Sequence, residues 1–138
     1  MDSEITEEIE ADDGSKGNKL PMAPDLSGSL IASYSIPMTG GDIVLTGQYV
    51  YQDEAYGGTG NFELSKVDSW SQVDLRIGYR SYSDWSATLY VDNVTDEEYF
   101  ERGWENADED DRFGYGLINS MVWPNRPRTI GVTVDKHF

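Results

Sequence analysis

The chain has 138 residues, and its 26 acidic side chains outnumber 10 basic ones, which gives a formal net charge of −16. Nucleic-acid binding needs a basic surface, so this charge argues against nucleic acid as a partner. The absence of cysteine excludes disulfide frameworks and thiolate metal sites, and the single histidine, His137, is the penultimate residue, a poor position for a catalytic group or metal ligand.

The remaining polar residues form no localised catalytic or cofactor motif. No glycine loop with a Lys-Ser/Thr pair is present to hold phosphate. Paired carboxylates can hydrolyse glycosides, but no pair stands out among the 26 acids. Residues 106–117 resemble a calcium loop in their alternating acids, but Asp111 and Leu117 replace the glycine and glutamate that such a loop needs. We therefore expect no enzyme, no cofactor and no metal site.

The acidic residues are concentrated in two segments. Residues 1–13 contain seven acids and no base, and residues 96–112 contain nine acids and two arginines. The rest of the chain holds ten acids and eight bases, so it is nearly neutral. We expect residues 1–25 to be an acidic external loop or a disordered segment, followed by an ordered domain at 26–138.

Alternation of apolar and polar residues predicts an all-β fold with five strands, at residues 26–36, 42–52, 69–80, 85–93 and 129–138. Period-two alternation gives each strand one apolar and one polar face. The apolar faces carry, in chain order, Leu26, Leu30, Ala32, Tyr34 and Ile36; Ile43, Leu45, Tyr49 and Tyr51; Val73, Leu75, Ile77 and Tyr79; Trp85, Ala87, Leu89 and Val91; and Ile130, Val132, Val134 and Phe138.

The connections between these strands alternate in length. Residues 37–41 and 81–84 are short turns, whereas 53–68 and 94–128 are long and polar. Short turns at one end of a sheet and long loops at the other, with apolar outer faces and interfacial aromatics, are typical of transmembrane β-barrels. A self-contained soluble β-barrel or sandwich that binds a small apolar ligand is the alternative, since its strands also alternate.

Two C-terminal segments resemble TonB-dependent outer-membrane receptors. The first is Ala87–Phe100, which contains the run Asn93-Val-Thr-Asp-Glu-Glu-Tyr99, and the second is the Pro-Arg-containing stretch Arg126–Val134 that leads to Phe138. Residues 17–24 are similar to a further, less specific segment of that family. In this interpretation Thr95 and Glu98 have capping-box spacing and begin a short helical turn.

The resemblance implies an antiparallel meander that forms the C-terminal part of a transmembrane β-barrel in the bacterial outer membrane. Barrels of this family have about 22 strands around an N-terminal plug. Since the sequence shows five strands, no plug, no TonB-contacting segment (TonB box) and no signal peptide, we expect a C-terminal fragment. The implied function is active uptake of a nutrient such as an iron chelate, a cobalamin or a glycan, with the TonB complex acting through the missing plug.

The resemblance also implies roles for particular residues. The barrel-assembly machinery reads a C-terminal signal that Ile130, Val132, Val134 and Phe138 match, while Lys136 departs from it and is expected to extend its ammonium to the lipid headgroups. The partners are then outer-membrane lipid, this machinery and an extracellular nutrient that the sequence does not identify. Four aromatic residues of the loop 94–128 are candidates to stack on that ligand or to pack the loop on itself: Trp104, Phe113, Tyr115 and Trp123.

Overall fold

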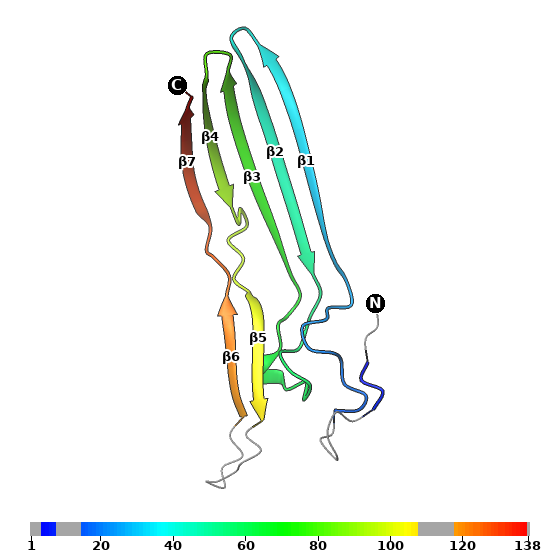
Figure 1. Cartoon of the computed structure of the whole chain (residues 1–138). Coiled ribbons are helices and arrows are strands. Elements are labelled where there is room, and N and C mark those ends of the chain that lie inside the picture. The colour runs from blue at the N-terminus through cyan, green and yellow to red at the C-terminus, as the bar shows by residue number, and fades with distance from the viewer. Residues whose placement is uncertain (1–3, 8–14, 108–117, 138) are drawn as a thin grey trace. The chain divides into compact units, whose positions relative to one another are not determined.

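A computed structural model of the chain describes residues 4–7, 15–107 and 118–137. Apart from one short 3-10 helix, the regular elements of the described part are all β-strands (Figure 1). The elements are β1 (Ser27–Met38), β2 (Gly41–Gln52), the 3-10 helix η1 (Glu63–Ser65), β3 (Trp70–Ser81), β4 (Trp85–Asp92), β5 (Phe100–Ala107), β6 (Ile118–Pro124) and β7 (Thr129–Lys136).

The five predicted strands form one antiparallel sheet in the order β1-β2-β3-β4-β7. Their observed bounds lie within three residues of the predicted ones. Pro37, which the alternation placed in a turn, lies inside β1. It is tolerated there because β1 is an edge strand of the described sheet, where a missing backbone N–H costs little.

The strand register separates an apolar face from a polar face. Across β3, β4 and β7 the apolar residues stand opposite one another, as in Ile77, Leu89 and Val132. One residue along, the row Gly78, Thr88 and Thr133 is polar or small. Since directly paired residues project to the same side of a sheet, each face is chemically uniform, as the alternation predicts.

The apolar face is exposed rather than packed. Leu30, Ile77, Leu89 and Val132 are between 45% and 68% exposed, and in the described part of the chain no apolar side chain of this sheet is buried. A sandwich would cover such a face with a second sheet. An apolar outer face with polar residues behind it is what a strand in a bilayer needs. No helix among the described residues is long and apolar enough to span a membrane.

A glycine in β7 accommodates a large side chain on the polar face. Gly131 is paired with Tyr90 of β4, and a Cβ atom added at Gly131 would lie 2.3 Å from the Tyr90 hydroxyl. The phenol ring therefore lies across the space that the glycine leaves free. This pairing protects the backbone of a strand glycine and fixes the register of β4 against β7.

The region 94–128, predicted as one long loop, contains a second sheet. β5 and β6 pair antiparallel from Phe100 opposite Pro124 to Ala107 opposite Ile118, with an irregularity between Phe100 and Arg102. The loop prediction was wrong for these residues because neither segment alternates cleanly, and each contains polar residues that are rare in strands.

The chain divides into two compact units. The first consists of residues 1–27, 52–70 and 99–125, and the second of 28–51, 71–98 and 126–138. In the first unit, Ala55 and Val67 form an isolated antiparallel bridge and are 1% and 0% exposed, and Ser65 is also fully buried. The connection between β2 and β3 therefore has a small core of its own.

Candidate functional site

The turn after β4 is organised by Asn93. This residue is 2% exposed and has a backbone φ of 53°, a left-handed conformation that asparagine tolerates better than most residues. Its backbone N–H donates to Asp74 Oδ1 at 2.9 Å, and its side-chain Oδ1 accepts the N–H of Glu97 at 3.1 Å. Its Nδ2 donates to the carbonyl oxygens of Glu97 at 2.9 Å and Arg126 at 3.3 Å. The backbone N–H of Asn93 thus joins the turn to β3, and its side-chain amide joins the turn to the segment that leads into β7.

The capping box expected at Thr95 and Glu98 is not formed. Residues 94–95 make a turn without a helix, and the Thr95 hydroxyl donates to Asn93 Oδ1 at 3.4 Å. The prediction was wrong because Asn93 Oδ1, in place of a Thr95 cap, accepts the backbone N–H of Glu97. Asparagine side chains commonly organise turns in this way.

The two segments that suggested the family lie against each other. Arg128 donates its backbone N–H to Asp96 Oδ1 at 3.0 Å and its guanidinium to Asp96 Oδ2 at 3.2 Å. Within the other unit, Tyr99 and Asn125 exchange two hydrogen bonds, and the ring of Tyr99 stacks on Trp70 with centroids 4.2 Å apart. Hydrogen bonds between Asp96 and Arg128 therefore join the two segments, and those between Tyr99 and Asn125 join the two ends of the hairpin region.

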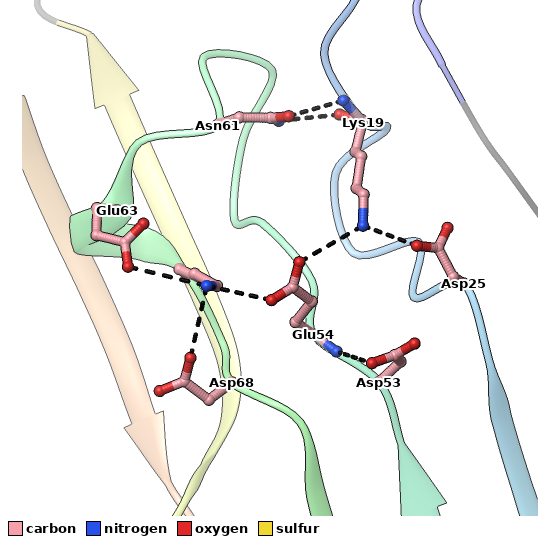
Figure 2. Close-up of polar contacts among 8 residues, drawn as sticks. Lys19, Asp25, Asp53, Glu54, Asn61, Glu63 and Asp68 are labelled. Carbon is pink, nitrogen blue, oxygen red and sulfur yellow. Dashed lines mark hydrogen bonds and ion pairs between the residues drawn. The ribbon is translucent and has the colours of Figure 1, made fainter.

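A network of ion pairs holds the segment before β1 against the β2–β3 connection (Figure 2). Lys19 Nζ lies 2.7 Å from Asp25 and 3.6 Å from Glu54, and Lys66 Nζ lies 3.1 Å from the other oxygen of Glu54. The side chain of Asn61 accepts the N–H of Lys19 and donates to its carbonyl oxygen, as the paired dashed lines in Figure 2 show.

The network shifts the proton affinities of its members. Hydrogen bonding to Asp25 raises the pKa of Lys19, and the same bond lowers the pKa of Asp25. Hydrogen bonding and charge attraction from Lys66 lower the pKa of Glu54, and Glu54 raises the pKa of Lys66. The charge pattern of the sequence did not reveal this network, because its members are spread over some 50 residues of chain.

The exposed face of the β5–β6 hairpin carries two of the predicted loop aromatics. The register places Arg102 opposite Trp123 and Trp104 opposite Met121, so these four side chains share one face. Trp104 and Trp123 are each 43% exposed, and Met121 is 58% exposed. Phe113 and Tyr115, the other two predicted aromatics, lie outside the described residues.

The opposite face of the hairpin packs closely on η1. A Cβ atom added at Gly103 would overlap the carbonyl oxygen of Ser65, so only a glycine fits there. Arg102 and Trp123 also line a shallow pocket of about 270 Å³ together with Glu101. One face of the hairpin is thus fixed by close backbone contact, while the tryptophans on the other face are partly exposed.

The predicted assembly residues lie along the apolar face of the edge strand β7. Ile130, Val132 and Val134 are 67%, 65% and 68% exposed, and Phe138 lies outside the described residues. Lys136 stands opposite Trp85 on the same face, and its ammonium donates to the carbonyl oxygen of Ser83 in the β3–β4 turn. The lysine stem therefore follows the apolar face while its charge reaches the end of the sheet.

In the described ranges, no cluster of three or more His, Asp or Glu side chains is placed to hold a metal ion. A sequence-family profile, described as the β-barrel of TonB dependent receptor-like proteins, matches residues 2–94. This chain belongs to that family. TonB-dependent receptors are bacterial outer-membrane proteins, and the exposed apolar face of the five-stranded sheet is the lipid-facing surface expected of such a barrel.

Two solved structures share the fold of this receptor barrel. The ferric yersiniabactin uptake receptor FyuA of Yersinia pestis matches 87% of this chain with a TM-score of 0.70 and 18% identity. The ferric preacinetobactin receptor BauA of Acinetobacter baumannii matches 95% of the chain with a TM-score of 0.65 and 18% identity. The chain spans 17% of the length of each of these two TonB-dependent barrels.

Proposed function

We propose that this chain is the C-terminal part of a TonB-dependent receptor that takes up a scarce nutrient across the outer membrane. The match of residues 2–94 to the receptor barrel carries the proposal. Active uptake requires the TonB complex, which acts through a plug that belongs to the remainder of such a receptor. Iron chelates, cobalamins and glycans are the candidate nutrients, and the names of the two structural neighbours make a ferric chelate the first ligand to test.

The loop lengths support a direction for the sheet in the membrane. The β1–β2 and β3–β4 turns are short, whereas the connections after β2 and β4 are long. Outer-membrane barrels place short turns in the periplasm and long loops outside. We therefore assign the acidic segments and the β5–β6 hairpin to the external side, where protease added to intact cells would cut them.

The exposed face of the hairpin is the proposed ligand contact. Trp104 and Trp123 offer flat apolar surfaces, and Arg102 adds a cation beside them. Aromatic rings stabilise stacked partners by about 0.5–1.5 kcal/mol beyond simple burial. The Arg102 guanidinium would favour a ligand that carries negative charge.

The edge strand β7 supports a second role, in assembly. Its exposed row of Ile130, Val132 and Val134, followed by the terminal Phe138, fits an apolar C-terminal signal for the barrel-assembly machinery. The same residues would face outer-membrane lipid once the barrel closes. Recognition by the assembly machinery before the barrel closes and contact with lipid after it closes both require apolar side chains at these positions.

Uptake of radiolabelled ligands by cells that express the complete receptor tests the proposal. A panel of ferric chelates, cobalamin and glycans is offered to cells with the unmodified receptor, with Trp104→Ala and with Trp123→Ala. Uptake of one ligand should depend on the TonB complex, and its half-saturation should rise about tenfold in each variant, the equivalent of roughly 1.4 kcal/mol.

Leu64→Ala is the matched control, because Leu64 is an exposed apolar residue that lies outside the hairpin. Its uptake should equal that of the unmodified receptor. If no ligand of the panel is taken up in a TonB-dependent way, the transport proposal is wrong. If uptake occurs but both tryptophan variants behave like Leu64→Ala, the hairpin is not the ligand contact.

A further inference from the structure

A hollow on the polar face of the five-stranded sheet is lined by two arginines. It has a volume of about 240 Å³ and lies over β2, β3 and β4. Arg76 and Arg80, four residues apart on β3, project from the same face and both line it. The hydroxyl groups of Thr46, Ser86 and Thr88 complete the polar lining.

The hollow exists because Gly78 stands between the two arginines. A Cβ atom at this position would lie 3.3 Å from the Thr88 hydroxyl and 3.9 Å from the carbonyl oxygen of Val44. Any larger side chain would project into the space between the guanidinium groups. The glycine therefore leaves a gap that a group from another segment can enter.

The two arginines differ in how far their charge is neutralised. Arg76 donates one hydrogen bond to Asp92 Oδ1 at 3.0 Å, and the other donors of its guanidinium remain available. For Arg80, no acidic partner lies within 4.0 Å among the residues that the structure describes. Asp135 is on the same face, but it is paired with Ser86 and so lies two strands away from Arg80. Asp42 of β2 alternates with Val44 and Thr46 and is also on this face, but it accepts a hydrogen bond from the Tyr82 hydroxyl and makes no ion pair with Arg80.

We propose that this hollow is an anion site, and that its occupant is the carboxylate of an Asp or Glu side chain on a polypeptide segment that crosses the polar face. A guanidinium fork matches a carboxylate with two parallel hydrogen bonds. The site places an excess of positive charge inside a chain whose net charge is −16. A carboxylate therefore supplies the charge that Arg80 lacks.

The position of the hollow supports a polypeptide occupant. The polar face of a membrane barrel points into the lumen, away from lipid phosphates. Wide receptor barrels of this kind enclose further polypeptide in that lumen. A volume of about 240 Å³ accepts one side chain with its backbone alongside. The inference depends on the barrel fold and is independent of the nutrient that the receptor transports.

Photo-crosslinking in the outer membrane of cells that express the complete receptor tests the site. Thr46, which lines the hollow without contacting either arginine by hydrogen bond, is replaced with p-benzoylphenylalanine, and the captured peptide is identified by mass spectrometry. We expect a peptide with an acidic residue at or beside the crosslink. Arg80→Gln should lower the crosslink yield about tenfold, as for the loss of a charge-assisted hydrogen bond.

A charge exchange makes the test specific. Arg80→Glu should abolish the crosslink, and converting the captured acid to arginine in the same chain should restore it. Arg80→Lys, which keeps the charge and the fold but not the fork, should retain part of the yield. Lys16→Gln is the matched control, since it removes the same charge outside the hollow and should change nothing.

Several results would overturn the proposal. They are an unchanged yield in the Arg76→Gln, Arg80→Gln double variant, a captured peptide without an acidic residue, a crosslink to lipid only, and a charge exchange that fails to restore the yield. Heat-modifiable migration of each variant on gels shows that the barrel has folded. A variant that fails this check is replaced by Arg80→Lys, whose partial yield still decides the question.

Discussion

Replacing Asn93 with alanine should open the turn between β4 and the segment that follows it. The side chain makes hydrogen bonds to the N–H and carbonyl oxygen of Glu97 and to the carbonyl oxygen of Arg126. The loss of each hydrogen bond to a part-buried backbone group costs about 1–3 kcal/mol. Alanine also tolerates the left-handed backbone poorly, which adds about 1 kcal/mol. With the lower end of the range for all three groups, we expect a local destabilisation of about 4 kcal/mol.

Hydrogen exchange of the receptor in lipid nanodiscs measures this opening directly. The Glu97 amide, which donates to Asn93 Oδ1 at 3.1 Å, should exchange roughly 100-fold faster or more in Asn93→Ala, since each 1.36 kcal/mol is about tenfold. Asn93→Gly removes the side chain but accepts the observed φ, so its loss should be smaller by about 1 kcal/mol. If the exchange rate of the Glu97 amide in both variants stays within twofold of the rate in the unmodified protein, the role assigned to the Asn93 side chain is wrong.

Two further predictions concern the sheet face and the ion-pair network. Val132→Lys places a charge on the apolar face and should destabilise the barrel in lipid by about 2–4 kcal/mol, whereas Thr133→Lys, on the opposite face, should cost much less; equal losses in urea titrations would contradict the face assignment. Lys66 lowers the pKa of Glu54 below its ordinary value of 4.5 in the folded chain. The ion pair therefore stabilises the fold fully above about pH 4.5, and this stabilisation is lost as the pH falls through the lowered pKa. The protection factors of residues 15–25, which are corrected for the intrinsic pH dependence of amide exchange, should therefore fall below about pH 4.5. Lys66→Gln should lower them a few-fold at pH 7 and flatten their pH dependence; an unchanged pH profile in this variant would show that the ion pair is not responsible.

The strands of the large sheet could be predicted because each one carries its own signal. Residues 69–80 alternate so regularly that the apolar row of Val73, Leu75 and Ile77 is visible without any knowledge of its neighbours. The register in the structure agrees, since Leu75 stands opposite Val91 and Ile77 opposite Leu89. When one face of a strand contacts lipid along its whole length, every second residue is apolar, so the pattern is visible in the local sequence.

The features that the sequence analysis missed depend on residues far apart in the chain. β5 and β6 have little strand character of their own and gain it from each other and from contact with η1. Lys19 and Lys66 meet at Glu54 only after the chain has folded back. The hollow at Gly78 needs three neighbouring strands before it exists. Trp104 and Trp123 share a face only because β5 pairs with β6, and no local sequence pattern predicts this pairing.

Pairing of β5 with β6 also affects the rate at which β7 pairs with β4 during folding. These two strands are separated by residues 93–128, and closing so long a stretch of flexible chain is entropically unfavourable. Once β5 and β6 have paired, Tyr99 and Asn125 are already joined, so the part of the stretch that remains free is about threefold shorter. On a logarithmic dependence of closure entropy this lowers the barrier by about 1 kcal/mol, or roughly fivefold in rate. The paired β5–β6 hairpin would then act during folding as a splint that brings β7 to β4.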